Sequence, residues 1–206
     1  CPVVIGPNRI QAAKHLMENT DSNVILSDDG LQHFSLGRDI EILMIDGNRK
    51  FGNELLLPAG PLREPKSRIK TVDFTISSNR KWPSVAKYEM KYRPFKWVHM
   101  KSQKEYDIFD WPLKKEVNAV AGIGNPSNFF NLLKQLGFEI SEYAFPDHHD
   151  FHSVDFEIME NQPTVMTEKD AIKCSFLDHT NYWYLKIEAE VSDNFEQDFL
   201  AEIKSK

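Results

Sequence analysis

The sequence predicts an α/β protein in which buried strands and amphipathic helices alternate along the chain. Short apolar runs end at turn residues at Ile40 to Ile45, Val72 to Ile76, Val117 to Ala121 and Pro163 to Thr167, a pattern typical of buried parallel strands. Stretches with one apolar face, such as Asn8 to Asn19 and Asn194 to Ile203, predict helices. A further helix is expected near Val154 to Glu160, and Thr167 can cap the helix that follows the last of these runs. The 206 residues, 41% hydrophobic and 12% aromatic, are enough to form a core.

Composition excludes several classes of function. The net charge of −6 comes from 25 basic and 31 acidic residues spread along the chain, so nucleic acid is not an expected partner. Cys1 and Cys174 lie too far apart in sequence for a metal motif and suit a reducing compartment. No apolar run approaches the roughly 20 residues that span a bilayer, so any membrane contact is expected to be peripheral.

The first residues predict a β-α-β unit, with strands at Pro2 to Gly6 and Val24 to Asp28 around a helix capped by Asn8. The second strand ends at the adjacent carboxylates Asp28 and Asp29. Ligands of parallel sheets bind at such strand ends, and Mg²⁺ takes one or two protein carboxylates beside phosphate oxygens. Asp46-Gly47 after the next strand favours this phosphate site, whereas the alternative is that Asp28-Asp29-Gly30 is only a turn.

The segment from Asn48 to Lys70 is rich in proline and predicts a long irregular loop, which is usually functional or mobile. Within it, Arg63 is a candidate phosphate ligand because its guanidinium fork matches phosphate geometry. The alternative is a surface arginine paired with Glu64.

Alternating aromatic and basic residues around Arg93-Pro94 predict two extended strands joined near the proline. We therefore expect three parts: residues 1–83, a β-ribbon linker at 84–115, and a smaller α/β domain at 116–206. The same alternation could bind single-stranded nucleic acid, but the acidity of the chain argues against that function.

The last part contains two candidate sites. Gly122-Ile123-Gly124 lacks the third glycine and the acid of a dinucleotide fingerprint, so a nicotinamide cofactor is not expected, although the helix start after it could receive an anion. Three histidines and two aspartates within residues 147–152 invite a zinc hypothesis. We favour instead a single catalytic or capping histidine, which beside a carboxylate could help to deprotonate a sugar hydroxyl. Lys169 could bind a phosphate or the adenine. The alternative, which we prefer, is a solvated lysine that pairs with Asp170.

Several strings occur together in the order found in one family. They are Ser27-Asp28-Asp29-Gly30-Leu31-Gln32-His33, Asp46-Gly47, Gly52-Asn53, Leu57-Pro58-Ala59-Gly60-Pro61-Leu62-Arg63-Glu64-Pro65, Phe145-Pro146-Asp147-His148-His149 and Thr167-Glu168-Lys169-Asp170. On these strings the chain resembles the tetraacyldisaccharide 4'-kinases, which phosphorylate the lipid A disaccharide precursor of Gram-negative bacteria. The resemblance covers essentially the whole chain.

The resemblance implies an incomplete P-loop NTPase-like α/β/α domain and a smaller C-terminal α/β/α domain, joined by a two-stranded β-ribbon. It implies that Asp28 and Asp29 hold Mg²⁺ on ATP, and that His148 pairs with an aspartate of the family's first domain to activate the sugar 4'-hydroxyl. His33, Arg63, Asp147 and Lys169 are implied as substrate- or phosphate-binding groups. The implied partners are ATP, the acylated disaccharide and, peripherally, the cytoplasmic face of the inner membrane.

One family motif is absent from the 206 residues. No Gly-x-x-x-x-Gly-Lys-Ser/Thr string occurs, so the loop that cradles nucleotide phosphates is missing. In the family this loop lies upstream, with the membrane-docking segment. We therefore expect a C-terminal portion of a longer kinase that is inactive alone. The alternative is a non-catalytic remnant that still binds a nucleotide or a lipid-linked sugar.

Overall fold

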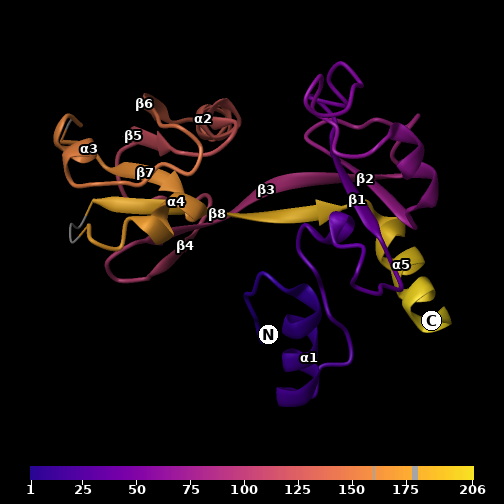
Figure 1. Ribbon diagram of the computed structural model, residues 1–206. Helices are drawn as coiled ribbons and strands as arrows, with labels where there is room; N and C mark the ends of the chain where they lie inside the picture. Colours follow the sequence, from indigo (N-terminus) through magenta and orange to yellow (C-terminus); the bar gives the residue numbers. More distant parts are fainter. Residues whose placement is uncertain (160, 178–180) are drawn as a thin grey trace. The chain divides into compact units, whose positions relative to one another are not determined.

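The computed structural model describes residues 1–159, 161–177 and 181–206, which form two compact units (Figure 1). Unit 1 comprises residues 1–91 and 190–206, and unit 2 comprises residues 92–189. These limits differ from the predicted boundaries at residues 83 and 115. The largest difference is that the C-terminal helix belongs to unit 1, although it follows unit 2 in the sequence.

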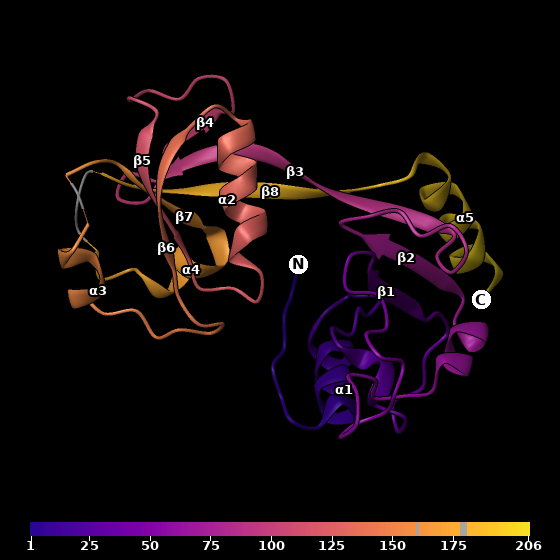
Figure 2. The same cartoon turned by 90° about the horizontal axis from the view of Figure 1, so that it is seen from above.

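Unit 1 is built on parallel strands: β1 (Ile42–Asp46), β2 (Phe74–Ser78) and the first residues of β3 (Tyr88–His99). Its α-helices are α1 (Arg9–Asn19) and α5 (Asp193–Ser205), and its 3₁₀ turns are η1 (Gly30–Gln32) and η2 (Lys66–Thr71). Figure 2 shows α5 lying along the β1–β2–β3 part of the sheet. β1 and β2 were expected, since both are short apolar runs.

Aromatic packing explains why the C-terminal helix returns to unit 1. Phe74 and Tyr88 are buried on the sheet, and both meet the ring of Phe195 edge-on, at centroid distances of 5.5 and 5.1 Å. Phe199, one helical turn later, also packs on Phe74. Burying such rings contributes roughly 2–3 kcal/mol each, so these contacts fix α5 on the sheet.

The N-terminal β-α-β prediction is half right. The helix α1 forms as expected, because the side chain of Asn8 accepts hydrogen bonds from the amides of Ile10 and Gln11. The two flanking strands were wrongly predicted, since residues 2–6 and 24–28 are irregular. Ile5 and Leu26 are 93% and 86% exposed, so neither run is buried against a neighbouring strand of the described residues. An apolar run forms a stable strand only when a neighbour supplies the hydrogen bonds and the packing.

The prediction of two strands joined near Arg93-Pro94 was also wrong, because β3 is one strand that continues through both residues. Pro94 lies between the stretch paired with β2, which ends at Met90, and the stretch paired with β4, which begins at Lys96. Neither β2 nor β4 pairs with Pro94, so neither of them loses a hydrogen bond to the amide that proline lacks. A two-stranded connection is present, but its second strand is β8 (Tyr182–Val191), because β3 and β8 both run from one unit into the other.

Unit 2 contains a parallel sheet in the order β8-β7-β5-β6, with β4 paired antiparallel to β3. Its remaining strands are β4 (Glu105–Asp107), β5 (Glu116–Ala121), β6 (Glu139–Ala144) and β7 (Thr164–Thr167). Its helices are α2 (Pro126–Gln135), α3 (Val154–Glu157) and α4 (Glu168–Lys173). α3 was expected to reach Glu160, a residue outside the described part of the chain.

Two apolar clusters cover opposite faces of this sheet. Alternate residues of β5 point to opposite sides, so Val117 and Ala119 pack with Leu133 of α2, whereas Val120 packs with Met166 and Ala171. All of these side chains are buried. Unit 2 is therefore a three-layer α/β/α arrangement, as the sequence predicts, with the carboxyl ends of its strands free to carry loops.

Candidate functional site

The strand order of unit 2 creates a switch point at the centre of its sheet. β5 lies between β6 and β7; the chain leaves β5 through α2 toward β6 on one side, and leaves β7 through α4 toward β8 on the other. In open α/β sheets, ligands bind outside the carboxyl ends of the strands at such a point. Three loops lie at this edge, after β5, β6 and β7, and each carries a predicted site string.

Asp147 joins these three loops. The Nζ atom of Lys169, from the β7–α4 turn, lies 3.8 Å from one carboxylate oxygen of Asp147, and the Nε2 atom of His148 lies 3.8 Å from the other. A Cβ added to Gly124, in the loop after β5, would be 3.4 Å from the same carboxylate. The structure thus brings together three predicted site residues, all exposed, and places beside them Gly124 of the glycine-rich turn, which the sequence marks as a candidate anion site. We refer to them as the Asp147 cluster.

Lys169 does not pair with Asp170, which was the preferred interpretation of the sequence. It approaches Asp147 instead, because Asp170 points inward and is fully buried. The partner of Asp170 is Lys173, one helical turn later, at 3.8 Å. A lysine at the first turn of a short helix with its amine beside an exposed carboxylate is well placed to meet an incoming phosphate.

The backbone of His148 is in the left-handed region, with φ of 62°. A residue with a Cβ seldom adopts this conformation, and it persists when surrounding contacts hold it. The amide of His148 donates to Asp147 Oδ1 at 3.1 Å, and the amide of His149 donates to the Pro146 carbonyl at 3.1 Å. The turn therefore holds the imidazole of His148 outward, with its side chain 74% exposed.

The neighbouring histidine has the opposite environment. His149 Nε2 lies 3.0 Å from Asp155 Oδ2, and its ring stacks on Phe145 and meets Phe151 edge-on. Lys173 Nζ donates to the His149 carbonyl at 3.2 Å. These contacts make His149 an anchor of the loop, whereas His148 faces solvent. The zinc hypothesis gains no support, because no three His, Cys, Asp or Glu side chains of the described chain are grouped to hold a metal.

Acid is expected to loosen this anchor. The hydrogen bond from the His152 amide, and then that from His149, lower the pKa of Asp155 below its ordinary value. A depressed carboxyl pKa contributes stability above the unfolded value of about 4, and this stability is lost as the pH falls through the folded pKa. In urea titrations below pH 4, the unfolding free energy of the unaltered protein should therefore fall more steeply with decreasing pH than that of an Asp155→Asn variant. Asp150→Asn, at an exposed carboxylate of the same segment, should retain the slope, and identical slopes for all three proteins would contradict this role.

A buried carboxylate ties two of the three loops together. Asp170 Oδ2 accepts hydrogen bonds from the Gly122 amide at 2.9 Å and from the Thr167 hydroxyl at 2.7 Å. Thr167 in turn caps α4 by accepting from the Asp170 amide, as the sequence predicts. A Cβ at Gly122 would lie 3.1 Å from the ring of Phe151 and 3.3 Å from Asp170, so a larger residue there would displace these side chains.

We expect Asp170→Ala to lower the free energy of unfolding by about 3 kcal/mol, because it leaves the Gly122 amide and the Thr167 hydroxyl buried without an acceptor. Asp170→Asn keeps one acceptor oxygen and should lose roughly 1 kcal/mol. Urea unfolding of the three proteins gives the comparison. Equal losses for the two variants would show that the acceptor is not what stabilises the loop.

In unit 1, Asp28 and Asp29 lie in a tight turn before η1, and both are exposed. Asp29 is in the left-handed region with φ of 51°, a conformation that aspartate tolerates better than most residues. The structure thus combines the two alternatives drawn from the sequence: the pair is in a turn, and its oxygens face outward. Two adjacent carboxylates are hard oxygen donors of the kind Mg²⁺ takes beside phosphate oxygens, so the donor set fits that ion. We call residues 28–33 the acidic turn.

Both carboxylate oxygens of Asp46 accept local hydrogen bonds. Its Oδ1 accepts from the amides of Asn48 and Arg49 at 2.8 and 3.2 Å, and its Oδ2 accepts from the Asn79 side chain at 3.1 Å. Both oxygens hold the turn after β1, as aspartate often does at turns. Of the two strands expected to end in an acid and a glycine, β1 forms, whereas residues 24–28 form no strand.

Residues 53–65, the central part of the irregular loop predicted from Asn48 to Lys70, are closed by their own hydrogen bonds, and we call them the proline-rich loop. The amides of Leu57 and Leu62 donate to the carbonyls of Leu62 and Leu55, at 2.9 and 3.1 Å. Gly60 is required for this closure, since a Cβ there would lie 2.4 Å from the Leu55 carbonyl oxygen. The loop is thus compact and holds its last residues in defined positions.

Arg63 is exposed at the end of this loop. The alternative pairing with Glu64 does not occur, because Glu64 turns the other way, toward Arg68 at 3.2 Å and Gln32 at 2.7 Å. The Arg63 side chain is therefore exposed and is not paired with Glu64, while Glu64 joins the loop to the acidic turn. Gln32 and Arg68, which make these connections, were not selected from the sequence.

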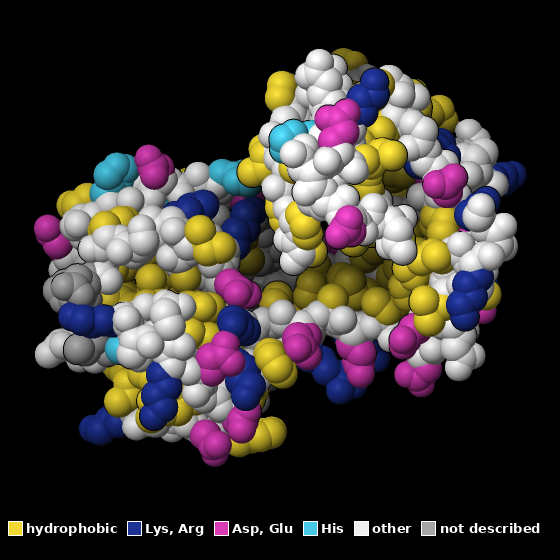
Figure 3. Space-filling view, turned by 90° about the horizontal axis from the view of Figure 1, so that it is seen from below, with side chains coloured by type: hydrophobic (Ala, Val, Ile, Leu, Met, Phe, Trp, Pro, Cys, Tyr) yellow, Lys and Arg dark blue, Asp and Glu magenta, His cyan; other side chains and the backbone are white. Residues whose placement is uncertain are grey.

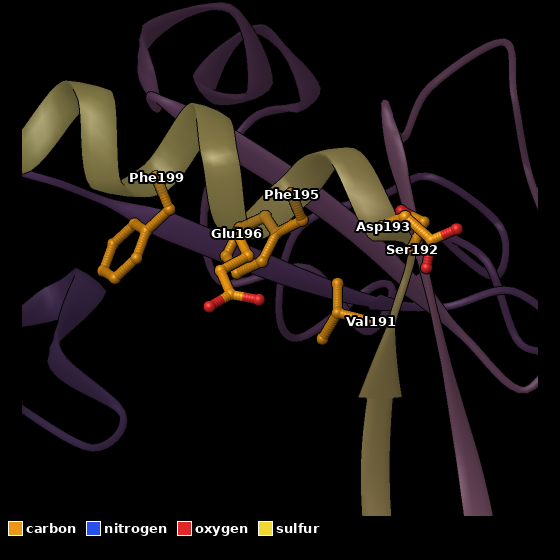
Figure 4. Close-up of a pocket in the computed structure, with 6 residues that line it drawn as sticks. All are labelled: Val191, Ser192, Asp193, Phe195, Glu196 and Phe199. Atoms are coloured by element: carbon orange, nitrogen blue, oxygen red, sulfur yellow. The ribbon is translucent and has the colours of Figure 1, made fainter.

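His33 lines a hollow of about 350 Å³ with the start of α1; its other lining residues are Pro7, Asn8, Arg9, Ile10 and Ser35. A second hollow, of about 510 Å³, lies at the start of α5 and contains no predicted site residue. Figure 4 shows Phe195, Glu196 and Phe199 projecting from the same side of that helix. This second hollow belongs to the packing of α5 and not to either site.

The surface carries mixed charges. On the face drawn in Figure 3, acidic and basic side chains are intermingled and do not form a patch of one sign.

Cys174 is buried, and burial raises the pKa of its thiol to about 12, so it behaves as a core residue. None of the helices in the described ranges has the length and apolarity needed to cross a bilayer.

Comparison with known proteins identifies the family. The family model described as tetraacyldisaccharide-1-P 4'-kinase matches residues 1–204. The chain belongs to the tetraacyldisaccharide 4'-kinase family. The resemblance of its strings to that family, noted from the sequence, is confirmed.

Two curated tetraacyldisaccharide 4'-kinases illustrate the similarity. The protein of Nitrosococcus oceani is 45% identical over 199 residues, which cover 95% of this chain and 57% of the relative. That of Legionella pneumophila strain Corby is 45% identical over 201 residues, covering 97% and 60%. A crystal structure of LpxK from Aquifex aeolicus in complex with ATP has a TM-score of 0.73 at 27% identity, covering 94% of this chain and 61% of that one. The chain thus spans about three fifths of the length of these 4'-kinases.

Proposed function

We propose that this chain serves an ATP-dependent 4'-kinase that phosphorylates the 4'-hydroxyl of the tetraacyl disaccharide 1-phosphate precursor in lipid A biosynthesis. The observation that carries the proposal is the Asp147 cluster, in which His148 is held outward by a left-handed turn beside Asp147 and Lys169. Family membership supplies the substrate class, and this cluster supplies a base and a cation of the kind that phosphoryl transfer requires.

The residues divide the work as follows. Asp28 and Asp29 would hold Mg²⁺, which when bound with ATP would neutralise phosphate charge. His148 helps to remove the proton of the sugar hydroxyl, and Asp147 keeps its imidazole in place. Lys169, Arg63 and His33 bind and orient phosphate groups, since each offers a donor to an oxyanion. The protein would act peripherally at the cytoplasmic face of the inner membrane, where the acylated substrate is available.

Complementation tests the proposal with the protein as its gene encodes it. Expressed in a Gram-negative strain depleted of its own 4'-kinase, the protein should restore growth and remove the accumulated disaccharide 1-phosphate, measured by mass spectrometry of the lipids. A His148→Ala version expressed at the same level serves as the negative control. Accumulation that persists with the unaltered protein would contradict the proposed function.

A second function is favoured by one observation, the absence of a phosphate-loop motif from the 206 residues. We infer that the chain on its own is inactive. As a remnant of the family, the protein would bind Mg-ATP or the lipid-linked sugar without transferring phosphate. Calorimetry of the 206-residue chain with Mg-ATP and, separately, with the disaccharide measures such binding. Binding without transfer by the protein as encoded would favour the remnant, whereas transfer would exclude it.

A further inference from the structure

A ring of charged side chains joins the acidic turn to the proline-rich loop within unit 1. Arg38 Nη1 donates to the carbonyls of Gly30 and Leu31, at 2.8 and 3.0 Å, and its Nε pairs with Glu41 at 2.8 Å. Glu41 also pairs with Arg68, at 2.5 Å. Guanidinium and carboxylate groups are planar, so each contact restrains the orientation of the next side chain in the ring.

The second half of the ring returns to the starting turn. Arg68 Nε pairs with Glu64 Oε2 at 3.2 Å, and the other oxygen of Glu64 accepts from Gln32 Nε2 at 2.7 Å. Gln32 follows the turn residues whose carbonyls Arg38 holds, so the connections form a closed circuit. Arg68 also donates to the Thr71 hydroxyl. The ring therefore reaches both predicted site segments of unit 1, which lie about 30 residues apart in the sequence.

Burial and anchoring distinguish this ring from ordinary surface ion pairs. The side chains of Glu41, Glu64 and Arg68 are only 12%, 19% and 21% exposed. The amide of Glu41 donates to Asp73 Oδ2 at 2.7 Å, and the Asp73 amide donates back to the Glu41 carbonyl at 3.1 Å. Glu41 is thus fixed at the point where β1 and β2 begin. Shielded, networked pairs of this kind contribute more than exposed pairs, which contribute about 0–1 kcal/mol.

We propose that Glu41 and Arg68 are positioning residues that lock the acidic turn to the proline-rich loop and so set where Asp28, Asp29 and Arg63 stand for Mg²⁺ and phosphate. This inference rests on the proposed function and deepens it, because neither residue faces a ligand itself. The hydrogen bond with Glu41 raises the pKa of Arg68, as expected for a guanidinium held by carboxylates. Lysine cannot replace Arg68, since one ammonium does not bridge both glutamates in a fixed plane.

The test uses Glu41→Gln and Arg68→Lys in the protein as encoded, with Lys87→Gln as the matched control. Lys87 pairs with Asp198 at 2.8 Å in the same unit, but this pair is exposed and touches neither segment. Amide hydrogen exchange at His33 and Leu36, which close the acidic turn, should rise about tenfold in the two ring variants, as for the loss of one charge-assisted hydrogen bond. The Mg²⁺ concentration for half-maximal activity should rise by a similar factor.

The outcomes separate the inference from the proposed function. Exchange rates and Mg²⁺ requirement that match those of Lys87→Gln would overturn the ring's role. Loss of thermal stability alone, with both readouts unchanged in the folded protein, would overturn it too. Failure of the unaltered protein to transfer phosphate would contradict the proposed function, while exchange at His33 and Leu36 would still decide whether the ring holds the turn. Arg68→Lys retains the positive charge, so it keeps the test possible if Glu41→Gln does not fold.

Discussion

Replacing His148 with alanine in the protein as encoded is expected to lower kcat for phosphoryl transfer by about 10²–10⁴-fold, the range contributed by general acid-base catalysis. The exposed imidazole lies 3.8 Å from a carboxylate oxygen of Asp147 and takes no part in the core, so its loss should leave the fold intact. The dissociation constant for Mg-ATP should change little, because the proposed role concerns the sugar hydroxyl. Steady-state kinetics and calorimetry measure the two quantities.

His152→Ala is the matched control for this experiment. His152 is also an exposed histidine of the same segment, and its contribution to the loop is the hydrogen bond from its backbone amide to Asp155. Its variant should therefore retain nearly full kcat. A His148→Ala enzyme with unchanged turnover, or with equal losses in turnover and ATP affinity, would remove His148 from the catalytic role.

Replacing Asp28 or Asp29 with asparagine is expected to lower kcat by about 10²–10³-fold, the loss seen when a preorganised electrostatic contact is removed. An amide keeps the size of the carboxylate but loses the charge that attracts Mg²⁺, so the Mg²⁺ concentration for half-maximal activity should also rise. Asp29→Asn should keep the turn itself, because asparagine tolerates the left-handed conformation of this position. Titration of activity with Mg²⁺ measures the effect.

Asp21→Asn provides the comparison, since Asp21 is another exposed aspartate of unit 1 before the acidic turn. It should not change the Mg²⁺ requirement. If all three variants behave alike, the acidic turn does not hold the metal, and the alternative that Asp28-Asp29-Gly30 is only a turn would be preferred.

Local sequence patterns predicted most of unit 2 because its strands and caps are defined locally. The apolar run of β5 and the Thr167 cap of α4 formed as expected. Residues 2–6 and 24–28 were wrongly predicted, because an apolar run does not reveal whether a neighbouring strand is present to pair with it. The break predicted at Pro94 was wrong for a related reason, because a strand tolerates proline wherever no neighbouring strand needs its amide as a donor.

The candidate site was predicted where a string carries its own chemistry and was missed where contacts are distant in sequence. The adjacent carboxylates of the acidic turn and the His148 turn were selected as strings. Arg68 and Glu41, 27 residues apart, show no local pattern that joins them. Asp170 was expected to pair with Lys169, but its side chain is buried and accepts a hydrogen bond from the amide of Gly122, 48 residues away. Long-range polar partners require the fold to be known.

The central claim is most directly tested by following phosphate from ATP to lipid. The protein as encoded is incubated with γ-³²P-labelled ATP, Mg²⁺ and tetraacyl disaccharide 1-phosphate in mixed micelles, and the position of the label is found by mild acid hydrolysis and chromatography. The proposal predicts label at the 4' position, only when Mg²⁺ is present, and its loss with His148→Ala. Label released as inorganic phosphate, or no transfer by a protein that binds Mg-ATP, would contradict it.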